Sequence, residues 1–131
     1  MALAPEFESV LTAVCSQRGW ERAGDEIQVP TEEGRAQLVW VEALEFEDDV
    51  LVRFASGIGP TEHIEPLHLN TALRLNYGLA HGALALRGEQ LVMVDTVFED
   101  SPDAEEIEAV VEYLAESADH FERTLFGTDE L

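Results

Sequence analysis

The chain has 131 residues, a length that fits one domain, and hydrophobic residues make up 46% of it, which argues against a wholly disordered protein. Aspartate and glutamate total 28 against seven basic residues, all of them arginine, so the formal net charge is −21. A surface of this charge repels phosphate backbones and anionic headgroups, which argues against nucleic-acid and membrane binding. Two explanations of the acidity stay open: a partner that is basic, or a solvent role such as adaptation to high salt.

Cys15 is the only cysteine, so neither an intrachain disulfide nor a thiolate zinc cluster can form. Its apolar neighbours favour a buried side chain. The amino terminus carries acids where a signal peptide carries basic residues, and no stretch approaches the roughly 20 apolar residues that span a bilayer. We therefore expect a cytoplasmic protein made of one domain, residues 1–131.

Apolar residues at helical spacing predict a first helix from Pro5 to Arg18. Three strands are expected next: a short one from Ile27 to Val29, then Gln37 to Phe46 and Val50 to Ala55. Both faces of the strand from Gln37 to Phe46 are apolar, whereas a sheet with one wet face shows cleaner alternation. Either helices cover both faces of this sheet or one face receives a partner.

A second helix is expected from Pro66 to Asn76. After it, residues 83–86 and 91–94 alternate around a turn at residues 87–90, which predicts a hairpin whose second arm is prolonged by residues 96–98.

The last helix is expected to begin with Ser101 as its N-cap and Pro102 at its first position, and to end at Gly127, with residues 128–131 fraying. The element order is therefore α-β-β-β-α-β-β-α. This order predicts an α+β domain in which helices pack on an antiparallel sheet of about five strands.

Residues with catalytic or metal-binding chemistry are sparse. His63 and His68 lie near each other, but their spacing matches no helical metal pair, and Pro66 prevents one regular helix from carrying both imidazoles. The segment Gly57-Ile58-Gly59 lacks the third glycine of a dinucleotide loop, and no nucleophile elbow, P-loop or zinc-protease motif is present. We predict no enzymatic activity, no catalytic residue, no resident metal and no cofactor.

The chain resembles the type III secretion chaperone-like superfamily, which includes the class I secretion chaperones and the YbjN-type regulators. The resemblance lies in the element order and in residues 73–78 (LRLNYG), residues 82–86 (GALAL) and the strand of residues 91–97, and it extends from Phe7 to Leu125. It implies a small acidic homodimer that binds an extended segment of another protein without catalysis.

The same resemblance implies apolar strand surface that receives the alternating side chains of the bound segment. The candidate partner-binding residues are Leu38, Trp40, Val50, Val52 and Phe54, and the candidate dimer interface is Leu69, Leu73 and Tyr77. The alternative is a YbjN-like regulatory adaptor whose partner is folded. A metal-binding or small-molecule-binding protein that uses the loop from His63 to His68 is a third, less favoured hypothesis.

Overall fold

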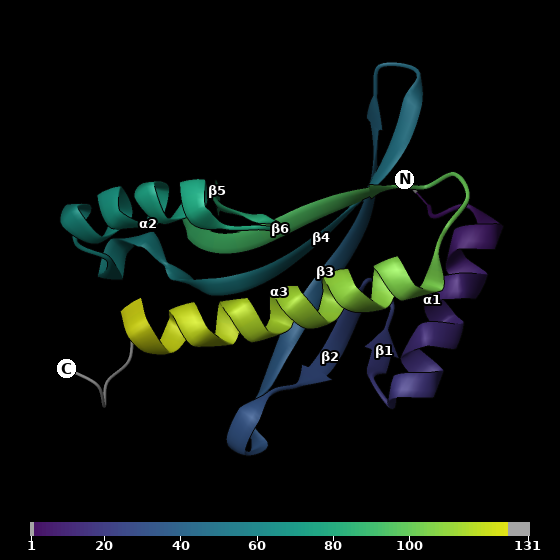
Figure 1. Cartoon of the computed structure of the whole chain (residues 1–131), viewed down its shortest axis with the longest axis horizontal. Helices are drawn as coiled ribbons and strands as arrows, with labels where there is room; N and C mark the ends of the chain where they lie inside the picture. Colours follow the sequence, from purple (N-terminus) through teal and green to yellow (C-terminus); the bar gives the residue numbers. More distant parts are fainter. Residues whose placement is uncertain (1, 126–131) are drawn as a thin grey trace.

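One antiparallel sheet of six strands, in the spatial order β1-β2-β3-β4-β6-β5, forms the centre of the molecule (Figure 1). The computed structural model describes residues 2–125. Its elements, in chain order, are α1 Pro5–Arg18, β1 Glu21–Ala23, β2 Glu26–Pro30, the 3-10 turn η1 Glu32–Gly34, β3 Ala36–Phe46, β4 Asp49–Pro60, the 3-10 turn η2 Thr61–His63, α2 Pro66–Gly78, β5 Ala83–Arg87, β6 Gln90–Phe98 and α3 Ala104–Leu125.

The α+β class and the expected order of elements are confirmed, with one strand more than expected. The extra strand, β1, has only three residues and pairs with β2 at the edge of the sheet. Its sequence, Glu-Arg-Ala, has no β-branched or aromatic residue, and alanine is depleted in strands, so only the pairing with β2 defines it.

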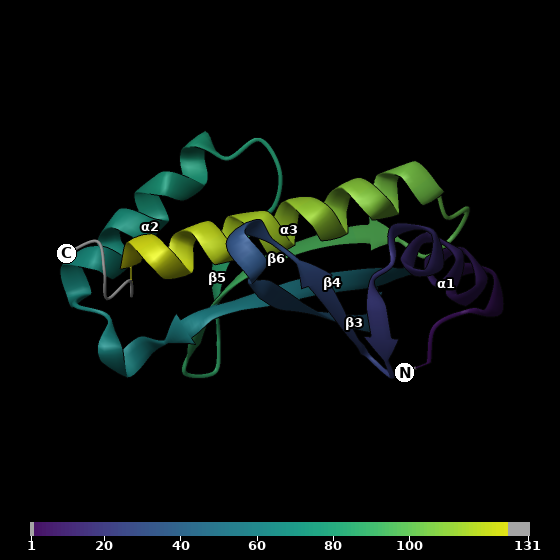
Figure 2. The ribbon, with the colours of Figure 1, turned by 90° about the horizontal axis from the view of Figure 1, so that it is seen from below.

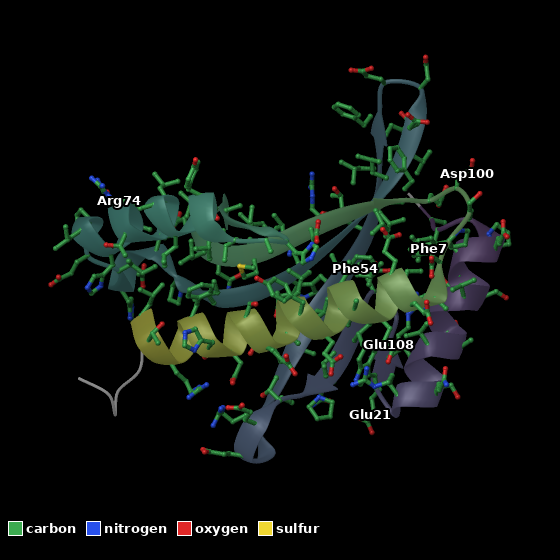
Figure 3. The ribbon with its side chains drawn as sticks, in the orientation of Figure 1. Phe7, Glu21, Phe54, Arg74, Asp100 and Glu108 are labelled. Carbon is green, nitrogen blue, oxygen red and sulfur yellow. The ribbon has the colours of Figure 1, made fainter. Side chains whose placement is uncertain are left out.

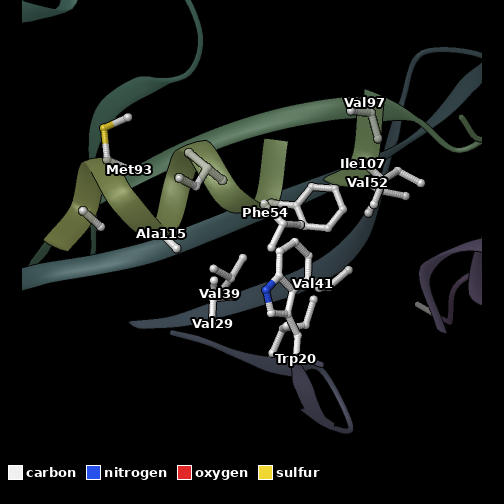
Figure 4. Close-up of a cluster of buried hydrophobic side chains, with 14 of the residues drawn as sticks. Trp20, Val29, Val39, Val41, Val52, Phe54, Met93, Val97, Ile107 and Ala115 are labelled. Carbon is white, nitrogen blue, oxygen red and sulfur yellow. The ribbon is translucent and has the colours of Figure 1, made fainter. Parts of the chain in front are cut away.

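The core lies between α3 and one face of the sheet. The apolar stripe of α3 places Ile107, Val111 and Leu114 in full burial over β3, β4 and β6. Figure 4 shows the sheet residues that meet this stripe, among them Val41 and Phe54, which point from neighbouring strands toward the helix. We call this the inner face of the sheet and the opposite face the outer face.

Helices α1 and α2 complete the inner side at its two ends, with α3 lying between them (Figure 2). Near the carboxyl end of α1, Arg18 reaches Glu108 and Glu112 of α3 at 2.6 and 2.8 Å. Asn76 near the end of α2 bonds β5: its amide accepts from Leu84 N–H at 2.6 Å and donates to Leu84 C=O at 3.0 Å. All three helices thus belong to one side of the sheet.

The start of α3 differs from the expectation. The helix begins at Ala104, and its cap is Asp103, whose carboxylate accepts from the backbone N–H groups of Glu105 at 2.9 Å and Glu106 at 3.3 Å. Ser101 instead adopts a positive φ of 54° in the turn after β6, so its side chain stands outside the helix. The expected end of the helix at Gly127 and the tail of residues 128–131 lie outside the described residues.

A buried carboxylate joins α3 to the turn before β3. Asp119 is 4% exposed and accepts hydrogen bonds from Arg35 at 3.0 and 2.9 Å. The hydrogen bonds from Arg35 hold the pKa of Asp119 below its ordinary value, and Arg123 adds a weaker attraction from 3.5 Å. This ion pair fixes the amino-terminal end of β3 against the second half of α3.

We predict that Asp119→Asn lowers the free energy of unfolding at neutral pH by about 2 kcal/mol, because it removes the negative charge that pairs with Arg35. The loss stays at this size because the Arg35 side chain is partly exposed and can still be hydrated. Since the folded-state pKa of Asp119 is depressed, its stabilisation is present above the unfolded pKa and is lost as pH falls through the folded-state pKa. The difference between wild type and variant should therefore narrow below about pH 4, as measured by urea unfolding at several pH values. Glu105→Gln, on an exposed part of the same helix, is the control; a difference that stays constant down to about pH 3 contradicts the assignment.

Candidate protein-binding surface

The outer face of the sheet carries no helix in the part of the chain that the structure describes. Cross-strand register aligns Trp40 of β3 with Ala55 of β4, and Ala55 with Val94 of β6. Ala55 and Val92 are buried although neither belongs to the main core, since apolar neighbours on this same face cover them. We call these residues the sheet patch: Leu38, Trp40, Ala55, Ala85, Val92 and Val94.

Trp40 lies at the centre of the sheet patch. A side chain at Gly57 would place its Cβ only 3.2 Å from the Trp40 indole, so this glycine gives the ring room to lie close to the sheet. The Arg87 guanidinium lies 4.9 Å from the centre of the same ring, a cation–π arrangement that holds the indole from the side of β5. The segment Gly57-Ile58-Gly59 thus sits within β4, at a β-bulge, as backbone that accommodates Trp40.

A shallow hollow of about 280 Å³ opens beside Trp40 on the outer face. Its floor is made of small apolar side chains, and Arg53 and Arg87 stand on its rim. Arg53 lies 3.6 Å from Glu42, which adds a polar row next to the sheet patch. The outer face therefore has an apolar hollow bordered by charged side chains, a composition that is typical of protein-binding surfaces.

A second apolar area lies beyond that polar row. The β3–β4 hairpin projects past the rest of the sheet as an arm (Figure 1). In register across its base, Leu44 opposes Leu51, and Leu51 opposes Phe98 of β6. Phe46 and Phe98 are 55% and 61% exposed. We call this group the arm patch: Leu44, Phe46, Leu51 and Phe98.

The five strand residues expected to contact a partner divide between the two faces. Leu38 is 43% exposed and Trp40 partly exposed, both on the outer face. Val52 and Phe54 are fully buried against α3, because the register pairs them with Ala43 and Val41 on the inner face. This placement removes Val52 and Phe54 from the candidate surface.

Val50, the remaining strand candidate, is half-buried in the arm, where it pairs with Glu45 one step from the turn, and alternation places it on the same face as Val52 and Phe54. The residues that reasoning from the sequence missed are Ala55, Ala85, Val92, Val94 and those of the arm patch. Their apolar character was visible in the sequence, but their common face depends on the register between β4, β5 and β6.

The expected dimer residues also differ in exposure. Leu73 and Tyr77, one turn apart on α2, are 71% and 97% exposed, whereas Leu69 is half-buried against the core. Arg74 between them projects from α2 away from the sheet and bonds Asn70 at 2.8 Å (Figure 3). An exposed leucine and tyrosine at this spacing form a small apolar strip on α2.

The other candidate chemistry is dispersed. His63 lies 3.1 Å from its neighbour Glu62 in an exposed turn. No group of three or more His, Cys, Asp or Glu side chains in residues 2–125 is arranged to hold a metal ion. Cys15 is buried, as expected, and burial raises the pKa of its thiol. In the same residues, no helix is both long and apolar enough to cross a membrane.

Comparison with known proteins finds a likeness in structure. No protein-family model matches the sequence, and no curated protein matches it. A chain from the structure of the HopA1–SchA chaperone–effector complex superposes with a TM-score of 0.55, at 7% sequence identity, over 91% of each chain. At this identity the likeness shows the fold alone, an α+β fold shared over nearly the whole of both chains.

We predict that Phe54→Ala costs about 3 to 5 kcal/mol of stability, because it leaves a cavity beneath α3, whereas Leu38→Ser costs less than about 1 kcal/mol. Urea unfolding, followed by circular dichroism, measures the free energy of unfolding of both variants. A cost for Leu38→Ser close to that of Phe54→Ala would contradict the assignment of Leu38 to an open face.

Proposed function

We propose that this protein is a non-enzymatic, chaperone-like binding module that holds an extended segment of a partner protein on the outer face of its sheet. The observation that carries the proposal is the sheet patch, an apolar surface that no element of the described chain covers. The likeness in fold to a chain of a chaperone–effector complex supports it.

The two apolar areas of the outer face fit an extended segment. From Trp40 to Leu44 the distance along β3 is about 13 Å, which an extended segment covers in about four residues. Side chains two apart in such a segment point the same way, so one group can lie in the sheet patch and another in the arm patch. The polar row of Glu42 and Arg53 between the patches then meets the residues between those groups.

Charge adds a preference for the partner. A net charge of −21 attracts basic segments over a distance set by ionic strength and raises the rate of encounter. The apolar contacts then determine how long the segment stays bound. A chaperone of this kind acts by covering apolar residues of its partner, and this requires no catalytic group.

The test is capture from native cell extract with the tagged full-length protein, followed by truncation of the captured partner to its shortest bound fragment. We expect a fragment that is unstructured when free, and we expect Leu38→Ser combined with Trp40→Ser to weaken its binding at least about tenfold, as for loss of a central anchor. Leu75→Ser is the matched control, since Leu75 on α2 is 40% exposed and Leu38 is 43% exposed.

Two results would count against the proposal. A captured fragment that binds only as a folded domain would favour the regulatory-adaptor alternative. If the folded Leu38 and Trp40 double variant binds the fragment as tightly as wild type does, the partner binds away from the outer face.

We also propose that two copies associate through α2. Leu73→Glu should then convert a species of twice the 14.5 kDa chain mass into a monomer, because it places a charge in the apolar strip beside Tyr77. Light scattering after size exclusion measures this, with Leu75→Glu as the control on the same helix. A wild-type mass of 14.5 kDa at high micromolar concentration contradicts the dimer.

A further inference from the structure

The few arginines of this chain differ in whether a carboxylate holds them. Among residues 2–125, five of the seven pair with carboxylates: Arg18, Arg22, Arg35, Arg53 and Arg123. Of the other two, Arg74 bonds Asn70 on α2, and Arg87 lies over the Trp40 ring on the outer face. A cation–π contact uses none of the N–H donors of a guanidinium. The donors of Arg87 are therefore available to a carboxylate from another molecule.

Arg87 and Arg53 border the same hollow, the one of about 280 Å³ beside Trp40. The register places Arg87 opposite Gln90 and Arg53 opposite Thr96, so the two side chains start from opposite ends of the hollow. The floor between them consists of small apolar side chains: Ala55, Ala85, Val92 and Val94. A bound group therefore meets an apolar floor and, at each end, a guanidinium.

The carboxylate that lines this hollow holds Arg53 only weakly. Glu42 lies 3.6 Å from Arg53, which is too long for a hydrogen bond, and the two side chains are 47% and 40% exposed. Exposed ion pairs of this kind contribute little net stability. An incoming carboxylate can therefore bind Arg53 without breaking a contact on which the fold depends.

The charge around the hollow is opposite to the charge of the whole chain. Two guanidiniums and one carboxylate give its lining a formal charge of +1, whereas the chain carries −21. At about 150 mM salt, exposed charges are screened beyond roughly 8 Å, so a group inside the hollow responds chiefly to the lining. The long-range field thus favours a segment that is basic overall, and the hollow favours a carboxylate within that segment.

We propose that this hollow selects the partner segment by binding one glutamate side chain that stands between apolar residues of the segment. The selection rests on the proposed function, because it concerns the same surface. The methylene groups of the glutamate lie on the floor, and its carboxylate accepts hydrogen bonds from Arg87 and Arg53. Apolar side chains two residues away on either side point the same way and contact the rest of the outer face.

The probe is a labelled peptide of sequence Ser-Lys-Leu-Lys-Glu-Lys-Leu-Lys-Ser. When it is extended, the leucines and the glutamate point to one side and the lysines to the other. Matched peptides carry glutamine or lysine in place of the glutamate. Each is titrated with the full-length protein at about 150 mM salt and followed by fluorescence anisotropy.

We expect the glutamate peptide to bind at least about fivefold more tightly than the glutamine peptide, and the lysine peptide to bind most weakly. The net charge of the chain alone predicts the reverse order, because each replacement makes the peptide more positive. The sign of the difference therefore separates recognition in the hollow from general attraction.

Two variants test whether the arginines bind the carboxylate directly. Arg87→Glu should reverse the order, so that the lysine peptide binds at least about fivefold more tightly than the glutamate peptide. Arg53→Gln should reduce the preference for glutamate about twofold, because Arg87 remains. Arg74→Glu is the control: it changes the net charge as Arg87→Glu does, but on α2, and should keep the wild-type order. Circular dichroism verifies that each variant is folded.

The proposal is overturned if the glutamate peptide shows no saturable binding or binds no more tightly than the glutamine peptide. It is also overturned if folded Arg87→Glu and Arg53→Gln keep the wild-type preference. The captured natural partner separates this proposal from the proposed function. If its fragment fails to bind the Leu38 and Trp40 double variant but binds Arg87→Glu as wild type does, the proposed function stands and the selection by carboxylate fails.

Two further outcomes with the natural fragment are decisive. If both variants lose it, and replacing one glutamate of the fragment with glutamine weakens its binding to wild type, both proposals hold. If the double variant binds it as wild type does, the proposed function fails, and with it the selection of that partner by the hollow.

Discussion

The arrangement of this molecule depends on how one amphipathic helix covers one face of a sheet. Helix α3 has 22 residues and is therefore about 33 Å long, enough to cross a sheet of six strands once. Its buried residues include Ile107, Val111, Leu114 and Ala118, all on one stripe. Because a single helix has a single apolar stripe, α3 packs against the inner face only. No other helix among the described residues covers the outer face.

Three of the seven arginines form ion pairs that connect different helices and strands. Arg18 joins α1 to α3, Arg22 joins β1 to Glu8 of α1, and Arg35 joins η1 and β3 to Asp119 of α3. The pKa values of Glu8, Glu112 and Asp119 are all lowered, in each case chiefly by a hydrogen bond from arginine. Since these cations are committed within the fold, most surface carboxylates among residues 2–125 have no partner within the chain, which suits both a basic ligand and a strongly ionic solvent.

Much of the fold follows from local signals in the sequence. Pro5, Gly19 and Pro66 mark helix boundaries that depend only on backbone chemistry, and α1 has the bounds predicted for it. The strand β1 and the cap of α3 escaped prediction because pairing in space defines the first, and because Ser101 and Asp103 are both competent caps on sequence grounds.

The candidate surface depends on register, which is a long-range property. Period-two alternation groups Val52 with Phe54, but it does not say whether they share a face with Trp40 or with Val41. A shift of one residue between β3 and β4 would exchange the two faces, and nothing in either strand's own sequence specifies that shift. The hairpin turn sets it: Phe46 pairs with Asp49 around two residues, and Val41 therefore meets Phe54 on the inner face.

The same register places the sheet patch and the arm patch on one face of the sheet. Phe98 belongs to the arm patch because it lies opposite Leu51 and its side chain is exposed. The apolar strip of Leu73 and Tyr77 lies on α2, which is at the other end of the sheet from the arm (Figure 1). Association of two copies through that strip leaves the arm of each copy accessible, so pairing of copies and binding of a segment are compatible in one molecule.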